Sequence, residues 1–80
     1  MQSIIEIDLH GKNRYQAKIA LDAALRRAPL GTMRIRAIHG FHGGTSLRDF
    51  VHEEYASHPK VRRLETRRDG GATDLILCEL

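Results

Sequence analysis

Apolar and polar side chains alternate near the start of the chain, between residues 4 and 10. In an extended strand such alternation places the two kinds on opposite faces. The pattern therefore predicts a strand over residues 4–10 that ends at Gly11. Asp8 and His10, two positions apart, are expected on the same polar face.

The period then changes to that of a helix. Asn13 is expected to cap its start, with Gln16 three residues later completing a capping box. Pro29 and Gly31 end it. The apolar residues recur at intervals of three and four and form one helical face: Ala17, Ala20, Leu21, Ala24, Leu25 and Ala28. The alanines on this face predict close packing of the helix onto a sheet.

The remaining pattern predicts three more strands and one more helix. A strand over residues 33–38 ends at His39-Gly40, and a glycine-rich turn follows it. A helix capped by Thr45 or Ser46 then runs to His58-Pro59, and its apolar positions are Leu47, Phe50, Val51 and Tyr55. Strands over residues 61–67 and 73–80 flank a hairpin-like turn at residues 69–72.

This order predicts the fold class α/β, as an α+β two-layer sandwich of the form β-α-β-α-β-β. A strand–helix–strand unit joins parallel strands by a right-handed crossover, so both helices fall on one face of a four-stranded mixed sheet. The 80 residues, 41% of them hydrophobic, fit one core. We therefore expect a single domain over residues 1–80.

Composition and charge limit the partners and the cellular location that we expect. Thirteen Lys and Arg against ten Asp and Glu give a formal net charge of +3, which suits a polyanionic partner. The one cysteine, Cys78, excludes an internal disulfide and a cysteine-rich zinc site. No apolar run approaches the roughly 20 residues needed to span a bilayer, and the N-terminus lacks a signal-peptide pattern. These features predict a cytoplasmic protein without a membrane partner. An exposed edge strand would permit a dimer without requiring one, so we expect a monomer or weak homodimer.

Two His-Gly pairs stand at the carboxyl ends of the first two predicted strands. The carboxyl ends of parallel strands share one rim of a sheet, where ligands of open α/β sheets bind. We therefore expect His10, Gly11, His39, Gly40 and His42 to be neighbours in space. The alternative is that each pair simply closes a strand, with glycine supplying a positive φ.

The side chains expected at this rim suit phosphate chemistry. Asp8 would accept a hydrogen bond from His10 and raise its basicity; in the alternative, Asp8 pairs across the sheet with Arg34 or Arg36. A phosphate would be held near a helix N-terminus, with His39 and His42 contacting or protonating its oxygens. The candidate phosphate-binding residues are Gly11, Gly40, His42, Gly43, Gly44, Thr45 and Arg48. No His-x-x-x-His spacing is present, so we expect no metal and no cofactor, with a divalent cation as the alternative.

A basic segment lies along the third predicted strand and its turn: Lys60, Arg62, Arg63, Arg67 and Arg68. It fits the backbone of a nucleic acid and, equally, the charge that protects an edge strand from pairing. His52 and His58 are expected on the solvated surface.

Three segments together resemble the small MutS-related (Smr) domain family: Ile7-Asp8-Leu9-His10-Gly11, Ile38-His39-Gly40 with its glycine-rich turn, and Gly70-Gly71-Ala72-Thr73. The resemblance runs from about Ile4 to Leu77 and implies a stand-alone version of that domain. It implies a fold like the C-terminal domain of bacterial translation initiation factor three. One departure is His42, which stands where the family has glycine, in a loop that is one residue longer.

The resemblance also implies nucleic-acid binding and, as in several family members, nicking of DNA or cleavage of RNA. By position it assigns catalytic roles to Asp8, His10 and His39. The leading hypothesis is therefore a nucleic-acid-binding protein with endonuclease activity. The alternative is a module that binds phosphate, nucleic acid or another protein without catalysis.

Overall fold

The computed structural model describes residues 4–40 and 46–79. The elements appear in the predicted order: β1 (Ile4–Asp8), α1 (Arg14–Arg27), β2 (Arg34–Ile38), α2 (Ser46–Tyr55), β3 (Arg63–Thr66) and β4 (Ala72–Ile76). None of the described helices is long and apolar enough to cross a membrane.

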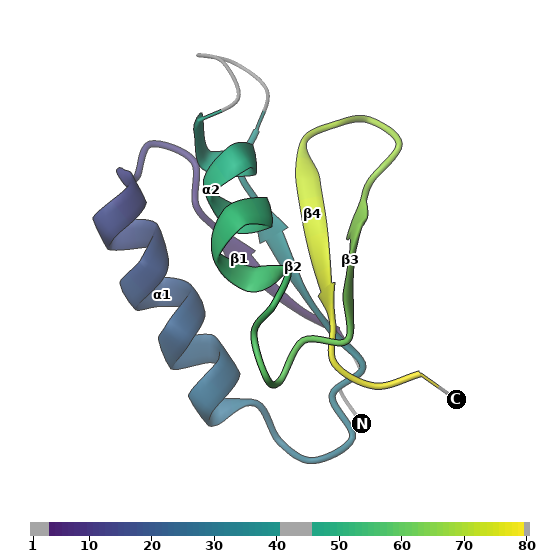
Figure 1. Ribbon diagram of the computed structural model, residues 1–80. Coiled ribbons are helices and arrows are strands. Elements are labelled where there is room, and N and C mark those ends of the chain that lie inside the picture. Colours follow the sequence, from purple (N-terminus) through teal and green to yellow (C-terminus); the bar gives the residue numbers. More distant parts are fainter. Residues whose placement is uncertain (1–3, 41–45, 80) are drawn as a thin grey trace.

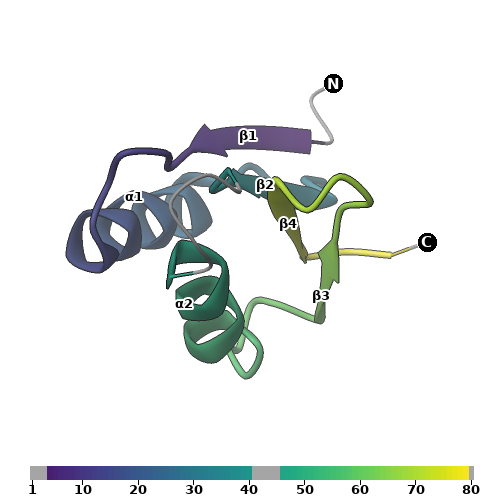
Figure 2. The ribbon, with the colours of Figure 1, turned by 90° about the horizontal axis from the view of Figure 1, so that it is seen from above.

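The sheet has the strand order β1-β2-β4-β3. β1 runs parallel to β2, whereas β4 is antiparallel to both of its neighbours. Both helices lie on the same side of the sheet (Figures 1 and 2). The predicted two-layer sandwich with a mixed four-stranded sheet is therefore confirmed.

Several predicted boundaries were too long. α2 ends at Tyr55, before His58-Pro59, because the chain leaves the helix through a tighter turn in which the His58 amide donates to the Tyr55 carbonyl (3.2 Å). Val61 lies outside β3, yet its side chain is buried in the core. β4 ends at Ile76, after which the Leu77 amide donates to the Met33 carbonyl (2.8 Å).

The start of α1 carries the predicted capping box. The Asn13 side chain accepts from the Gln16 amide (2.8 Å), and the Gln16 side chain accepts from the Asn13 amide (3.0 Å). We expect Asn13→Ala to lower the free energy of unfolding by about 1 kcal/mol, because it leaves an amide of the first turn without its side-chain acceptor. Urea denaturation measures this loss; an unchanged stability would contradict the cap's contribution.

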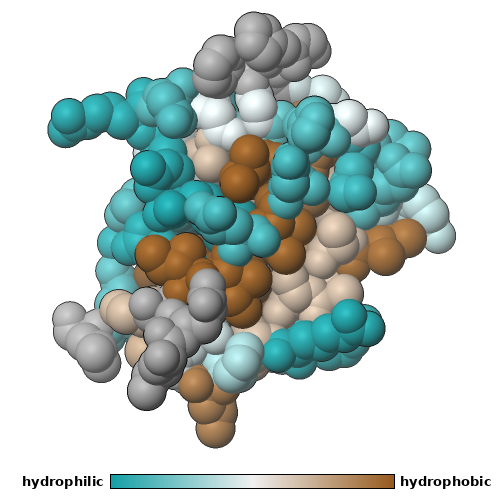
Figure 3. All heavy atoms as spheres, turned by 180° about the vertical axis from the view of Figure 1, so that it is seen from behind, coloured by the Kyte–Doolittle hydropathy of each residue, from teal (hydrophilic) through white to brown (hydrophobic). Residues whose placement is uncertain are grey.

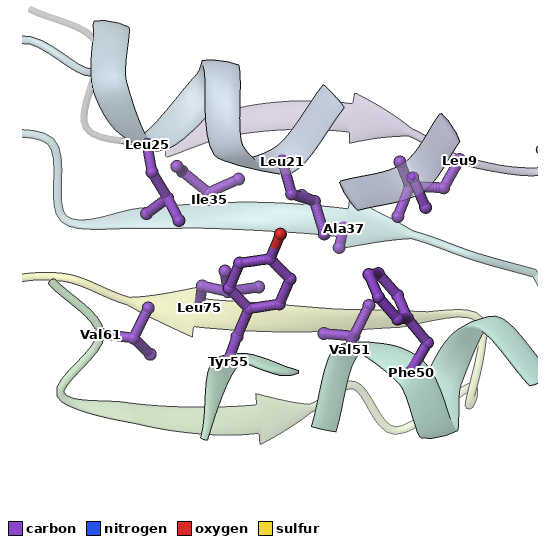
Figure 4. Close-up of a cluster of buried hydrophobic side chains, with 11 residues drawn as sticks. Leu9, Leu21, Leu25, Ile35, Ala37, Phe50, Val51, Tyr55, Val61 and Leu75 are labelled. Atoms are coloured by element: carbon purple, nitrogen blue, oxygen red, sulfur yellow. The ribbon is translucent and has the colours of Figure 1, made fainter. Parts of the chain in front are cut away.

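The core lies between the helices and the sheet. Leu21 of α1 and Val51 of α2 pack with Leu75 of β4 in one buried cluster (Figure 4). Tyr55 of α2 is 1% exposed, and its hydroxyl donates a hydrogen bond to Asp22 of α1 (2.7 Å), which connects the two helices. Burial and this hydrogen bond raise the pKa of Tyr55, so the hydroxyl remains a donor.

The opposite face of the sheet carries a charged cluster. Asp74 of β4 is 1% exposed and accepts from Arg34 (2.7 Å) and Arg36 (2.9 Å), both on β2. Seen from behind, a band of hydrophobic residues is flanked by hydrophilic ones (Figure 3). Both helices lie on the other side of the sheet, so Asp74 is buried and ion-paired on a face that no helix covers.

Candidate functional site

β1 and β2 end, and both helices begin, at the same edge of the fold (Figure 1). A pocket lies at this edge. The parallel register places Asp8 of β1 opposite Ile38 of β2, so the two His-Gly turns leave the sheet side by side. The described residues around the pocket come from both turns and both helix starts: Asp8, His10, Gly11, Lys12, Asn13, Arg14, Tyr15, Ile38, His39, Gly40, Ser46, Leu47 and Arg48. The structure thus brings together two segments that lie far apart in the sequence.

Asp8 and His10 form a hydrogen-bonded pair at the pocket. The Oδ1 atom of Asp8 lies 2.8 Å from His10 Nδ1 and also accepts from the His10 amide (3.1 Å). These bonds hold the pKa of Asp8 below its usual value, so it remains a carboxylate. The alternative pairing with Arg34 or Arg36 is wrong, because Asp74 takes both of those guanidinium groups.

The pair fixes the state of the His10 ring. A carboxylate only accepts hydrogen bonds, so Nδ1 must carry the proton that it donates. In the neutral ring, Nε2 then holds a lone pair, and the side chain is largely exposed. His10 therefore offers a proton acceptor to whatever occupies the pocket.

His39 lies in the same rim but points into the protein. It is 5% exposed; Nδ1 donates to the Gly40 carbonyl (2.9 Å), and Nε2 lies 2.9 Å from the Thr73 hydroxyl. The sequence placed His39 against a phosphate, and this geometry does not fit that role because both ring nitrogens are engaged internally. These contacts connect the turn at Gly40 to Thr73 of β4.

The two glycines have equivalent backbone conformations. Gly11 has φ 79° and Gly40 has φ 73°, a region that L side chains rarely adopt. A Cβ atom at either position would meet no protein atom within 4 Å. The backbone conformation, rather than crowding by the protein, therefore accounts for glycine at both turns.

The pocket is electropositive. Lys12 and Arg48 line it, and Lys12 has no ion-pair partner among the described residues. Arg14 also lines it but is committed to Ser46 (3.3 Å) and Glu53 (3.2 Å). The N-termini of α1 and α2 both open onto the pocket and add their positive dipole ends. This arrangement suits an anion such as a phosphate.

Four candidate residues lie outside the described part of the chain: His42, Gly43, Gly44 and Thr45. Their predicted role at a phosphate rests on the sequence alone. Within residues 4–40 and 46–79, no group of three or more His, Cys, Asp or Glu is placed to hold a metal ion.

Sequence reasoning missed several contributions. Lys12 and Tyr15 line the pocket because they lie within two residues of Asn13, the N-cap of α1. Their closeness in sequence to the predicted cap could have indicated this. Thr73 holds the His39 ring from a strand 34 residues away. His52 was expected on the solvated surface, but its Nε2 atom lies 3.1 Å from the Thr66 hydroxyl and 3.4 Å from that of Thr73.

The basic segment is divided between the two ends of the sheet. Arg63 of β3, an edge strand in the described sheet, pairs with Glu79 (2.7 Å) and Glu65 (3.1 Å). Arg67 lies beside Gly40 in a shallow hollow next to the pocket, because the β3–β4 turn reaches the same rim. Neither Arg67 nor its neighbour Arg68 has an ion-pair partner among the residues described, so the rim half of the segment remains open to an anion.

The fold and the site define a class: a two-layer α/β domain with paired His-Gly turns and a pocket lined by cationic side chains at the rim of its parallel strands. The pattern of the Smr domain family matches residues 7–77, and the chain belongs to that family.

Comparison with solved structures gives the same result. The Smr domain of Thermus thermophilus MutS2 is similar, with 29% sequence identity and a TM-score of 0.82 over 94% of this chain and 99% of that chain. A search among curated proteins gives no match.

Proposed function

We propose that this chain binds nucleic acid at the pocket and cleaves a phosphodiester bond there, nicking DNA or cutting RNA. Membership of the Smr family supports the choice of nucleic acid as the partner. The observation that carries the proposal is the Asp8–His10 pair, in which His10 lines an electropositive pocket and its Nε2 atom has no hydrogen-bond partner among the described residues.

The proposed chemistry uses each group for one task. The His10 Nε2 atom accepts the proton of a water or ribose hydroxyl as its oxygen attacks phosphorus. The bond between phosphorus and the leaving oxygen breaks, and that oxygen takes up a proton from solvent. Asp8 stabilises the imidazolium that forms, and it keeps the ring oriented. Lys12, Arg48 and amides of the first helical turns bind the non-bridging oxygens. We include His42, Gly43, Gly44 and Thr45 in the phosphate-binding loop from the sequence pattern.

A second candidate function is binding without cleavage. It is favoured by the burial of His39, which leaves His10 as the one described imidazole of the pocket free to transfer a proton. Product formation from labelled DNA and RNA, measured with and without divalent cations, separates the two candidates. Binding without product under all of these conditions would select the second.

Binding itself is expected to depend steeply on salt. Four cations are candidates for contact with phosphates: Lys12 and Arg48 of the pocket, and Arg67 and Arg68 of the β3–β4 turn. Arg48 lies 3.8 Å from the Asp49 carboxylate, whereas the other three have no ion-pair partner among the described residues. If all four contact phosphates of a single strand, affinity should fall about 50-fold between roughly 50 and 200 mM salt. Fluorescence anisotropy with a labelled oligonucleotide measures this slope.

A matched pair of lysine variants tests the location of binding. Lys12→Ala should weaken binding and lower the salt slope by about one. Lys60→Ala removes the same charge near the far end of α2, beside Arg26, and should change neither quantity. Equal effects of the two variants would place nucleic-acid binding elsewhere.

A further inference from the structure

Tyr15 is an aromatic side chain on the pocket wall that the proposed cleavage does not use. It is the second residue of α1 and is 73% exposed. Its ring contacts no other aromatic ring among the described residues. The other tyrosine, Tyr55, is buried in the core, so Tyr15 is the one tyrosine available to a ligand.

Position, rather than exposure alone, distinguishes Tyr15. Single exposed apolar residues are common on protein surfaces and need no explanation. The described residues include three large exposed ones, Tyr15, Ile19 and Leu30. Of these, Tyr15 alone lines the pocket. Tyr15 therefore lines the same pocket as the cations that would hold a phosphate.

We propose that Tyr15 is a stacking platform for an unpaired base next to the bound phosphate, so that the site selects single-stranded or unpaired nucleic acid. This inference rests on the proposed function. Lys12 and Arg48 provide the charge that binds the backbone, and the Tyr15 ring provides an apolar face beside it. Aromatic rings next to a cationic groove are the combination that binds single strands without sequence preference.

The geometry of a duplex explains the expected selectivity. In a continuous double helix both faces of each base are covered by neighbouring base pairs, so a protein ring can stack only on a base that is unpaired or extruded. The pocket has no second exposed aromatic in the described residues to separate base pairs. A duplex should therefore gain the phosphate contacts but not the contact with Tyr15.

The test compares Tyr15→Ala, Tyr15→Phe and a control, Ile19→Ala, which removes an exposed apolar side chain one turn further along the same helix, outside the pocket. Tyr15→Ala is expected to weaken binding of a single-stranded oligonucleotide by roughly fivefold to 100-fold and to leave duplex binding unchanged. Tyr15→Phe keeps the ring and should bind like the wild type, as should Ile19→Ala. Because Tyr15 and Ile19 are both exposed, all three variants should unfold at the wild-type temperature.

A second readout reports stacking directly. An oligonucleotide carrying 2-aminopurine should lose fluorescence on binding to the wild type and to Tyr15→Phe, but not to Tyr15→Ala. An oligonucleotide with an abasic site in place of the reporter should bind the wild type and Tyr15→Ala equally.

The outcomes separate the two proposals. Equal single-strand affinity of the wild type and Tyr15→Ala, with weaker binding by Lys12→Ala, would overturn stacking while leaving the nucleic-acid site in place. An equal loss of single-strand and duplex affinity in Tyr15→Ala would overturn the selectivity. A wild-type protein that binds no nucleic acid at low salt would overturn both proposals.

Discussion

Replacing His10 with alanine is expected to slow phosphodiester cleavage by about 100-fold to 10,000-fold, the usual contribution of a positioned general base. The imidazole accepts the proton of the nucleophile, and nothing else described in the pocket has a free ring nitrogen to replace it. Binding should change little, because the phosphate is held by Lys12, Arg48 and helix amides. Single-turnover cleavage rates and anisotropy titrations measure the two effects separately.

Two further variants make this result interpretable. Asp8→Asn keeps the shape of the side chain but removes the charge that stabilises the His10 imidazolium, so it should also slow cleavage, by less than the loss of His10. His58→Ala removes a histidine beside Lys60, outside the pocket, and should cut at the wild-type rate. If His10→Ala cuts as fast as the wild type, the observed product comes from another nuclease or from other residues of this chain.

Local sequence patterns predicted much of the fold. The alternation around β1, the spacing of apolar residues in α1 and the Asn13 capping box depend on residues close together in the chain, so they were visible without coordinates. The shared rim also followed, because a strand–helix–strand unit leaves little freedom in the direction of its strands. That is why the structure brings His10 and His39 to one pocket.

Contacts across the sheet could not be predicted in the same way. Both histidines follow a strand and precede a glycine, so the sequence makes them look equivalent. They differ in their hydrogen-bond partners. His10 bonds to Asp8 at the pocket, whereas the buried His39 ring contacts the hydroxyl of Thr73 on β4. The sequence left the alternative pairing of Asp8 with Arg34 or Arg36 open for the same reason, because the partner of both arginines, Asp74, lies about forty residues away in the sequence.

Asp74→Asn is expected to lower the free energy of unfolding by about 2–4 kcal/mol. Removing one partner of a buried ion pair leaves the other charge uncompensated, which commonly costs about 3–5 kcal/mol. The side chains of Arg34 and Arg36 are 26% and 17% exposed, so water solvates the orphaned charges in part and moderates the loss. In a domain of this size the change corresponds to a fall of about 8–30 °C in Tm.

Glu65→Gln is the matched control for this variant. Glu65 is a neighbouring carboxylate on the same sheet face and pairs with Arg34 (3.2 Å) and Arg63 (3.1 Å). Its side chain is 45% exposed, so its removal should cost no more than about 1 kcal/mol. Both substitutions replace a carboxylate by an amide. Chemical denaturation at neutral pH should nevertheless show a larger loss of unfolding free energy for Asp74→Asn than for Glu65→Gln.

The pH dependence of the stability difference between the wild type and Asp74→Asn tests whether this difference is electrostatic. Burial alone raises the pKa of Asp74, but hydrogen bonds from Arg36 and Arg34 outweigh burial and hold the folded-state pKa below the ordinary value of 3.8. The carboxylate therefore contributes stability above about pH 4, and this contribution is lost as the pH falls through the folded-state pKa. The gap between wild type and Asp74→Asn should be largest near neutral pH and should narrow below pH 4. A gap that stays constant from pH 7 to pH 2 would mean that Asp74 acts through packing rather than through its charge.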